Sequence, residues 1–545
     1  MSRPSFSPVF VLFRASLCAL SALPVASSAA DASPATIDWV ADATFLRERL
    51  PGLHPNLYHT LGAEAFARKL DAFIADRRSS EAERVLQLAQ IVAAIGEGHT
   101  RLTLPLAPQA RLFPTHAPTE PANVTQFTQF PLRLESTSDG YVVAAATDQM
   151  KVALGSVLVA IDARPVDDVV KRLGSLVHHD NAAQRRYLMA SFLVVPEILH
   201  ARGITGAVDR ATWTFRDRRG KRLSLPIQAL PSSQELNWNN LPNSSNALRN
   251  RNTDRDIWFE NFPAADAIYV RLRQIADDRS SGERFSDFSN RLLTAINHGP
   301  QQRLIIDLRG NSGGNSSLVW PLVTGLVRSE KLTRPGALYV IVDGGTFSAA
   351  VDLVADLEKA TPAIIVGERT GGSPNSYGDS RRLQLPSSGL TVRVSTRYTQ
   401  GSHGEDRRNT VKPQIDAPLT QTDFLDGSDS ALAAIVQRSS MIALPNGRWR
   451  GTVAFRYLDA QVDARIQDGG SGLAGWITMP EVGVAETQLD GLHFADTWLH
   501  AELKLERSTS RIELLQAREH LTGWIEYQGR PYPMVLYRVN ADASD

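Results

Sequence analysis

A serine stands between an apolar run and a helical pattern in the stretch VDGGTFSAAVDLVADLEKATPAIIVGERTGG, residues 342–372. The residue types predict a strand, a glycine turn, Ser348, a helix, a second strand and a second glycine turn. A serine directly before a helix has its hydroxyl at the positive end of the helix dipole, and the N–H of Ala349 has no partner inside the helix. The pattern predicts that Ser348 is a nucleophile and that Ala349 donates to an oxyanion. A helix-capping serine without chemistry is the alternative.

A second glycine-rich loop can supply the other oxyanion donor. The sequence IIDLRGNSGGNSS, residues 305–317, reads as a strand followed by a loop whose glycines allow positive φ and close backbone approach. Gly313 or Gly314 is the candidate donor, and the residue types do not separate the two. No Gly-Lys-Ser/Thr follows, so this is not a phosphate-binding loop. Asp307 and Arg309 are predicted to form an ion pair that supports the loop.

A serine nucleophile needs a base, which is commonly a histidine oriented by a carboxylate or a lysine with a depressed pKa. His99, in the sequence GEGHTRL, is the first candidate, and His403, in GSHGEDRR, is its rival. The carboxylates that could orient the base are Asp406, Glu405 and Glu368.

The elements that must position these residues fall into four blocks. Apolar residues at three- and four-residue spacing predict an N-terminal helical domain at 31–115. Short β-rich runs at 116–235, with a helical insert at 181–201, resemble a PDZ-like module. Alternating strands and helices at 255–437 predict a largely parallel sheet covered on both faces. Alternating strands with glycine turns at 443–545 predict a separate antiparallel β domain, a small sandwich or barrel.

The first thirty residues, 1–30, are predicted to be a secretory signal. They carry Arg3 and Arg14 and no acid, then a short apolar run and small residues, and the run is too short to span a bilayer. An uncleaved N-terminal helix is the alternative, and no later segment reads as transmembrane. Cleavage removes the only cysteine, Cys18, so the mature chain is expected to contain neither a disulfide nor a thiol nucleophile.

Several motifs in order carry a resemblance to a known family. LIIDLRGNSGG, DGGTFSAA and VGERTGGSP resemble the tail-specific, or C-terminal-processing, serine peptidase family, which includes the tricorn protease core. LPGLHPNLYHTLG and GEGHTRL are similar to the N-terminal part of that family. The resemblance implies a crotonase/ClpP-like α/β core, a PDZ-like domain before it, and Ser348 as the nucleophile.

The family divides over its base. One branch uses a lysine at the second glycine turn, where this chain has Ser373, and Lys359 lies about 16 Å beyond the nucleophile at 1.5 Å per helical residue. The tricorn-like branch uses a histidine from the N-terminal part and an acidic residue after the nucleophile. This branch implies His99 as base and Asp406 as its partner. It also has a serine directly before the histidine, where this chain has Gly98.

We therefore expect an exported serine peptidase, periplasmic or secreted, that acts on peptides or proteins and needs no metal or organic cofactor. Lysine plus arginine equals aspartate plus glutamate, 58 each, so no charge excess points to nucleic acid. A non-catalytic binding protein on the same scaffold and an esterase with the same site are the alternatives. The sequence leaves the oligomeric state and the substrate open.

Overall fold

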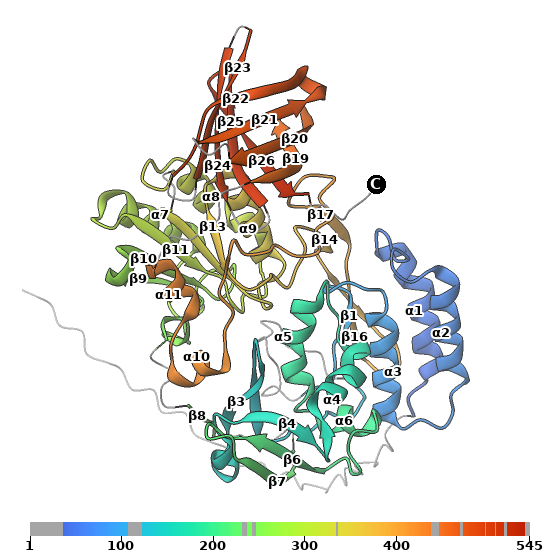
Figure 1. Cartoon of the computed structure of the whole chain (residues 1–545). Coiled ribbons are helices and arrows are strands. Elements are labelled where there is room, and N and C mark those ends of the chain that lie inside the picture. Colours follow the sequence, from blue (N-terminus) through green and yellow to red (C-terminus); the bar gives the residue numbers. More distant parts are fainter. Residues whose placement is uncertain are drawn as a thin grey trace, which may run out of the picture. The chain divides into compact units, whose positions relative to one another are not determined.

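The computed structural model describes residues 36–106, 122–231, 237–241, 247–333, 336–437, 446–468, 472–495, 498–506, 508–516 and 520–539. The fold is mixed α/β and multidomain, with an N-terminal helical segment and a C-terminal antiparallel barrel (Figure 1). The expected signal at 1–30 lies outside the described residues. Within the described part of the chain, no helix is both long and apolar enough to cross a membrane.

The N-terminal helical segment confirms the sequence expectation. Ser80 begins the third helix with a capping box, in which its hydroxyl accepts from the backbone of Glu83 and the Glu83 carboxylate accepts from Ser80. That helix ends just before the loop that contains His99. The three helices are α1 Trp39–Leu53, α2 Ala63–Ala75 and α3 Glu81–Ala93.

An antiparallel seven-stranded sheet follows, and the helical insert that the sequence predicted is present as two helices. The strands pair in the order β2-β3-β4-β6-β7, while β5 pairs with β4 and β8 pairs with β3. The PDZ-like assignment of this sheet stays a prediction. The strands are β2 Leu132–Thr137, β3 Gly140–Ala146, β4 Val157–Ile161, β5 Arg164–Pro165, β6 Arg210–Arg216, β7 Arg222–Gln228 and β8 Asn239–Asn240; the helices are α4 Val166–Leu173, α5 Ala182–Phe192 and α6 Pro196–Ala201.

The six-stranded core sheet has the order β18-β13-β12-β11-β10-β9. All neighbours are parallel except β9, which pairs antiparallel with β10. The prediction of a largely parallel sheet is thus confirmed, whereas its crotonase-like assignment stays a prediction. The strands are β9 Ile257–Phe262, β10 Ala267–Leu272, β11 Arg303–Asp307, β12 Leu338–Val342, β13 Ile364–Gly367 and β18 Ile415–Asp416; the helices around them are α7 Phe285–His298, α8 Trp320–Val327, α9 Ala349–Ala360, α10 Gln421–Asp426 and α11 Ser430–Gln437.

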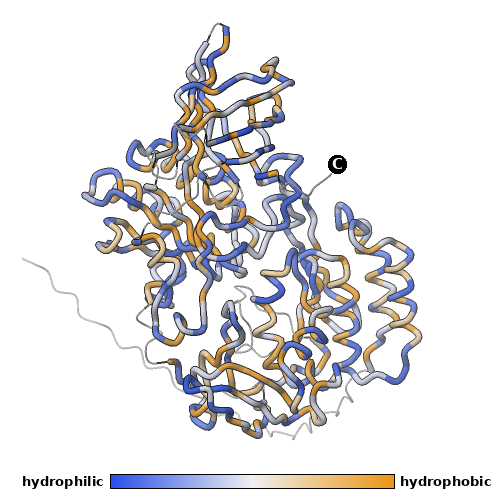
Figure 2. Tube along the Cα trace, in the orientation of Figure 1, coloured by the Kyte–Doolittle hydropathy of each residue, from blue (hydrophilic) through white to orange (hydrophobic). Residues whose placement is uncertain are grey.

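Both faces of the core sheet are buried, which explains why its strands are continuous apolar runs. Alternate strand residues such as Ile306 and Val340 join one buried cluster with residues of α7, α8 and α9. The intervening residues, such as Ile305 and Ile341, join a second cluster with residues of α11 and of the C-terminal domain, including Trp498. Figure 2 shows hydrophobic residues concentrated along these strands.

The C-terminal domain is a closed eight-stranded antiparallel barrel, so the barrel alternative of the prediction is confirmed and the sandwich is not. Its interior is filled by a hydrophobic cluster that contains Trp449 and Leu503, both almost fully buried. The strands are β19 Gly447–Phe455, β20 Leu458–Asp468, β21 Leu473–Met479, β22 Val484–Ala495, β23 Trp498–Leu505, β24 Ser508–Gln516, β25 His520–Tyr527 and β26 Arg530–Arg538.

Two small antiparallel sheets complete the surroundings of the site. One contains β1, β16 and β15 in that order, and the other pairs β14 with β17. In the first, Arg101 lies opposite Arg393. The segment after His99 therefore pairs with a strand that follows the core strands β9 to β13 in the sequence. The strands are β1 Arg101–Leu102, β14 Asn375–Gly378, β15 Arg381–Gln384, β16 Thr391–Val394 and β17 Arg397–Gln400.

Candidate active site

Ser348 lies on a strained turn between β12 and α9. Its backbone has φ 55° and ψ −130°, a conformation that residues other than glycine rarely adopt. Hydrogen bonds hold the turn in place: Thr346 Oγ1 donates to the carbonyl of Leu308 at 2.9 Å, and the N–H of Phe347 donates to the carbonyl of Asn311 at 2.9 Å. Ser348 makes no side-chain cap to α9. A strained serine on a sharp strand-to-helix turn is typical of nucleophiles, because the turn exposes the hydroxyl.

His99 lies beside that hydroxyl. Its Nε2 is 2.9 Å from Ser348 Oγ, and the residue is 7% exposed. The Phe347 ring packs against the imidazole, with ring centroids 4.2 Å apart. Burial lowers the pKa of His99 to about 4, although the nearby carboxylate of Glu97 acts in the opposite direction. The imidazole is therefore neutral at pH 7 and able to accept the serine proton.

The absence of a serine before His99 has a steric reason. A Cβ on Gly98 would lie 2.8 Å from Cζ of Phe347 and 2.8 Å from Oε1 of Gln184. A side chain at position 98 would therefore require Phe347 or Gln184 to shift. The placement of His99 comes from the short connection between α3 and β1, which the sequence alone shows only as a glycine-rich turn.

The carboxylate beside His99 is Glu97, which the sequence analysis did not select. Its Oε2 lies 4.0 Å from Nδ1 of His99 and also accepts from the backbone N–H of His99. Its Oε1 accepts from Ser395 Oγ at 2.7 Å and lies 3.5 Å from Nε2 of His54. Burial acts to raise the pKa of Glu97, but the neighbouring imidazoles, that of His54 first, and the hydroxyls of Thr100 and Ser395 outweigh it and lower the pKa to about 2. The signal for this residue was its position two residues before the histidine in GEGHT.

The structure does not place Asp406 beside His99. The Asp406 carboxylate accepts from Nε of Arg408 at 3.0 Å, and the same guanidinium contacts Glu358 at 2.8 Å. Burial acts to raise the pKa of Asp406, and the hydrogen bonds from Arg408 outweigh it and lower that pKa. Asp406 and Arg408 lie two positions apart in the chain and form this ion pair locally. The Asp406 carboxylate therefore already has a cationic partner other than His99.

The other candidates also lie in separate surroundings. His403, the rival base, has its Nδ1 3.7 Å from Asp459 of the barrel. Glu368 accepts from the backbone N–H of Leu419 at 3.0 Å. Lys359 pairs with Asp356 at 3.1 Å. The structure brings together Ser348 and His99 among the candidate nucleophile and bases.

The oxyanion candidates meet at Ser348. A Cβ on Gly313 would lie 2.6 Å from Cβ of Ser348 and 3.0 Å from the nitrogen of Ala349, so only glycine fits there without a shift. The N–H of Gly313 donates to Oδ1 of Asn311 at 2.9 Å, which occupies that donor. The N–H groups of Gly314 and Ala349 have no hydrogen-bond partner among the described residues. Geometry therefore favours Gly314 and Ala349 as the two donors.

The predicted ion pair between Asp307 and Arg309 is confirmed. Nε of Arg309 lies 3.0 Å from Asp307 Oδ1, and its Nη2 lies 2.8 Å from Asp429 Oδ2. Tyr269 also donates to Asp307 at 2.6 Å. Burial acts to raise the pKa of Asp307, but the charge of Arg309 outweighs it and holds the pKa well below its usual range. This buried network fixes the end of β11, where the glycine loop begins.

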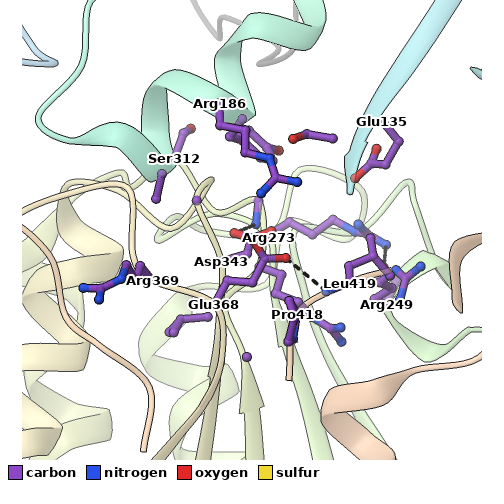
Figure 3. Close-up of a pocket in the computed structure, with 18 of the residues that line it drawn as sticks. Glu135, Arg186, Arg249, Arg273, Ser312, Asp343, Glu368, Arg369, Pro418 and Leu419 are labelled. Atoms are coloured by element: carbon purple, nitrogen blue, oxygen red, sulfur yellow. Dashed lines mark hydrogen bonds between the residues drawn. The ribbon is translucent and has the colours of Figure 1, made fainter. Parts of the chain in front are cut away.

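A cavity of about 640 Å³ is lined in part by Arg309, Gly310 and Ser312 of this loop. Arg186 from α5 points into it toward Asp343 and Glu368, which follow β12 and β13 (Figure 3). Glu135 from β2 lines the same space, and burial raises its pKa to about 7. Burial also raises the pKa values of Asp343 and Glu368. Residues of the seven-stranded sheet and residues at the ends of the core strands both line this cavity.

The described residues contain no group of three or more His, Cys, Asp or Glu side chains arranged to hold a metal ion.

Comparison with known proteins relates one segment of this chain to a described family. Residues 327–417, which contain Ser348, match the family described as peptidase family S41. The matched segment is therefore similar to that family over these residues. No curated protein sequence matches the chain.

Solved structures were also found that are similar to this chain. Mature CPAF aligns with a TM-score of 0.50 at 14% identity and covers 74% of this chain and 98% of its own. The photosystem II D1 C-terminal processing protease aligns with a TM-score of 0.37 at 15% identity, covering 75% and 99%. The tricorn protease aligns with a TM-score of 0.32 at 14% identity, covering 73% and 36%. The CPAF alignment supports the family's fold for this chain.

Proposed function

We propose that this peptidase hydrolyses peptide bonds by nucleophilic serine catalysis at Ser348. The observation that carries the proposal is the 2.9 Å contact between Ser348 Oγ and a buried His99 Nε2. Ser348 Oγ attacks the scissile carbonyl carbon while His99 removes the hydroxyl proton. The tetrahedral intermediate collapses to an acyl-enzyme, and His99 returns the proton to the leaving amine. A water molecule then releases the acyl group by the same steps, with His99 again as base.

Glu97 is the proposed partner of the base. Its carboxylate is ionised at neutral pH, because its pKa is about 2, and it lies 4.0 Å from His99 Nδ1. A direct hydrogen bond is shorter than this distance, so the support is mainly electrostatic in this arrangement. The negative charge stabilises the imidazolium that forms during attack. Asp406, paired with Arg408, is not available for this role.

The developing oxyanion is proposed to bind the N–H groups of Ala349 and Gly314. Ala349 directly follows Ser348, and Gly314 directly follows Gly313, which packs against Ser348. Neither N–H has an acceptor among the described residues. Preorganised backbone donors of this kind are typically worth about 10²–10³ in rate each.

The decisive experiment compares hydrolysis of unfolded protein and peptide substrates by wild type, Ser348→Ala and His99→Ala. Loss of a triad member typically lowers kcat by about 10⁴-fold or more. His403→Ala is the matched control, because His403 lies against the barrel, and it should retain wild-type rates. Inactive wild type toward peptides would refute the proposal, and activity toward p-nitrophenyl esters alone would make the chain an esterase.

We further propose that the chain is exported and acts in the periplasm or outside the cell. The support is the order of positively charged, apolar and small residues in the first thirty residues. The test is cell fractionation of full-length chain followed by N-terminal sequencing. A mature protein that begins near residue 31 in the periplasmic or extracellular fraction supports export. An intact N-terminus in the cytoplasm refutes it.

A further inference from the structure

The segment before α5 contacts two loops of the active site at once. Asp180 Oδ1 accepts from the backbone N–H of Gly98 at 2.6 Å, and its Oδ2 accepts from the N–H of Ser373 at 3.4 Å. Gly98 is the residue directly before His99, and Ser373 belongs to the second glycine turn. One carboxylate therefore joins the loop that contains the base to the turn beyond the nucleophile helix.

Hydrogen bonds hold the backbone around Asp180 in place. Its own N–H donates to Oε1 of Gln184 at 2.8 Å. The next residue, Asn181, begins α5 by accepting from the N–H of Gln184 at 3.0 Å. Nδ2 of Asn181 donates to the carbonyls of Thr370 at 3.0 Å and Asn409 at 2.6 Å. Asp180 is thus held on the core by its neighbours and does not depend on the His99 loop for its position.

The contact with Gly98 bears directly on His99. The base lies in a short connection between α3 and β1, and Gly98 already packs against Phe347 without room for a Cβ. The Asp180 carboxylate fixes the peptide that precedes the imidazole, and this sets the distance from Nε2 to Ser348 Oγ. Misplacement of a reacting group by about 1 Å can cost about 10²-fold in rate.

We propose that Asp180, directly before the helical insert of the seven-stranded sheet, is a positioning residue for His99. The inference rests on the proposed serine–histidine function. A carboxylate suits the place because each of its two oxygens meets an N–H donor. An asparagine offers one oxygen, so it can satisfy Gly98 while its amide group faces the N–H of Ser373.

The test is a double-mutant cycle with the whole chain and an activated p-nitrophenyl ester as substrate. The variants are Asp180→Ala, Asp180→Asn, His99→Ala and the double variant Asp180→Ala/His99→Ala. We expect Asp180→Ala to lower kcat about 10–100-fold with KM nearly unchanged, and Asp180→Asn to recover part of the loss. In the His99→Ala background the Asp180→Ala change should alter the rate by less than about twofold.

A matched control is Asp162→Ala, in the turn between β4 and β5 of the seven-stranded sheet. Asp162 also bridges two backbone N–H groups, those of Thr212 at 2.7 Å and Gly206 at 3.1 Å, away from the catalytic loops. Its variant should keep the wild-type kcat, which separates positioning from a general loss of loop order.

The outcomes are distinguishable. An equal loss with and without His99 would show that Asp180 is merely structural, and no loss in either background would show that it has no role. If Asp180→Ala does not fold, the asparagine variant decides. The proposal is overturned if a folded Asp180→Asn chain has the wild-type kcat and the pKa on the acid side of its kcat/KM–pH profile is unchanged. If wild type and Ser348→Ala hydrolyse the ester equally, the proposed function fails and this inference fails with it. If Ser348→Ala is inactive while Asp180→Ala is fully active, only this inference fails.

Discussion

Ser348 Oγ and His99 Nε2 are 2.9 Å apart although 249 residues separate them in the chain. Ser348 reaches this point on the turn after β12, and His99 reaches it on the connection between α3 and β1. The pairing of β1 with β16 ties the His99 segment to residues that follow the nucleophile. A hydroxyl and a buried neutral imidazole in this arrangement form a nucleophile and its base.

Replacement of Glu97 should damage catalysis much more than replacement of Asp406. Glu97→Gln keeps the shape but removes the charge 4.0 Å from His99 Nδ1, so the imidazolium loses its stabilisation. We expect kcat to fall about 10²–10⁴-fold, as when the carboxylate of a serine–histidine–aspartate triad is neutralised. The measurement is steady-state peptide hydrolysis.

Asp406→Asn is the control for Glu97→Gln. It disturbs the pair with Arg408, so it should lower the free energy of unfolding while leaving kcat within a few-fold of wild type. The reverse ranking of the two variants in kcat would assign the orienting role to Asp406.

The pH dependence of kcat/KM should show an acid limb near pH 4. Burial lowers the pKa of His99 to about 4, below the ordinary histidine value near 6.5. The base is active when neutral, so activity is present above pH 4 and is lost as the pH falls through that value. The rate–pH profile from about pH 3.5 to 9 measures the limb, since kcat/KM reports groups of the free enzyme. A limb centred near 6.5 that disappears in His99→Ala would contradict the expectation.

Asp180 titrates in a different range, and its variant separates the two groups. Burial raises the pKa of Asp180 to about 7. Any inflection near pH 7 should therefore disappear in Asp180→Asn, while the limb near pH 4 should remain. Persistence of the pH 7 inflection in that variant would assign it to another group.

Backbone strain at Ser348 should appear as a stability difference between two inactive variants. Ser348→Ala keeps a side chain at φ 55° and ψ −130°, whereas Ser348→Gly removes the Cβ that makes this conformation costly. We expect the glycine variant to have the higher free energy of unfolding, by about 1 kcal/mol. Urea unfolding of both variants measures the difference, and a less stable glycine variant would show that the turn stores no strain.

Addition of one methyl group at Gly313 should abolish activity. In Gly313→Ala the new Cβ would lie 2.6 Å from Cβ of Ser348, so either the oxyanion loop or the nucleophile must move. We expect kcat to fall about 10²-fold or more. Gly282→Ala is the matched control, because Gly282 also has positive φ but has nothing within 4 Å of its added Cβ. Equal activity of the two variants would refute a close contact at Gly313.

The sequence by itself predicted the local parts of this site. Ser348 was predicted from the glycine turns, the apolar strand and the amphipathic helix around it. The parallel core sheet was predicted from the apolar runs. Both predictions succeed because these features depend on neighbours along the chain. The pair of Asp307 and Arg309 was predictable for the same reason, since they lie two positions apart in the chain.

Only the tertiary structure decided which groups meet. Glu97 lies beside His99 in the connection after α3, where Ser395, from the turn after β16, donates to it. Asp406 instead pairs with Arg408, two positions along the chain. Asp180 reaches Gly98 and Ser373 from an insert whose position no local pattern encodes. Such contacts depend on the packing of segments distant in sequence, and residue type and spacing along one chain do not specify them.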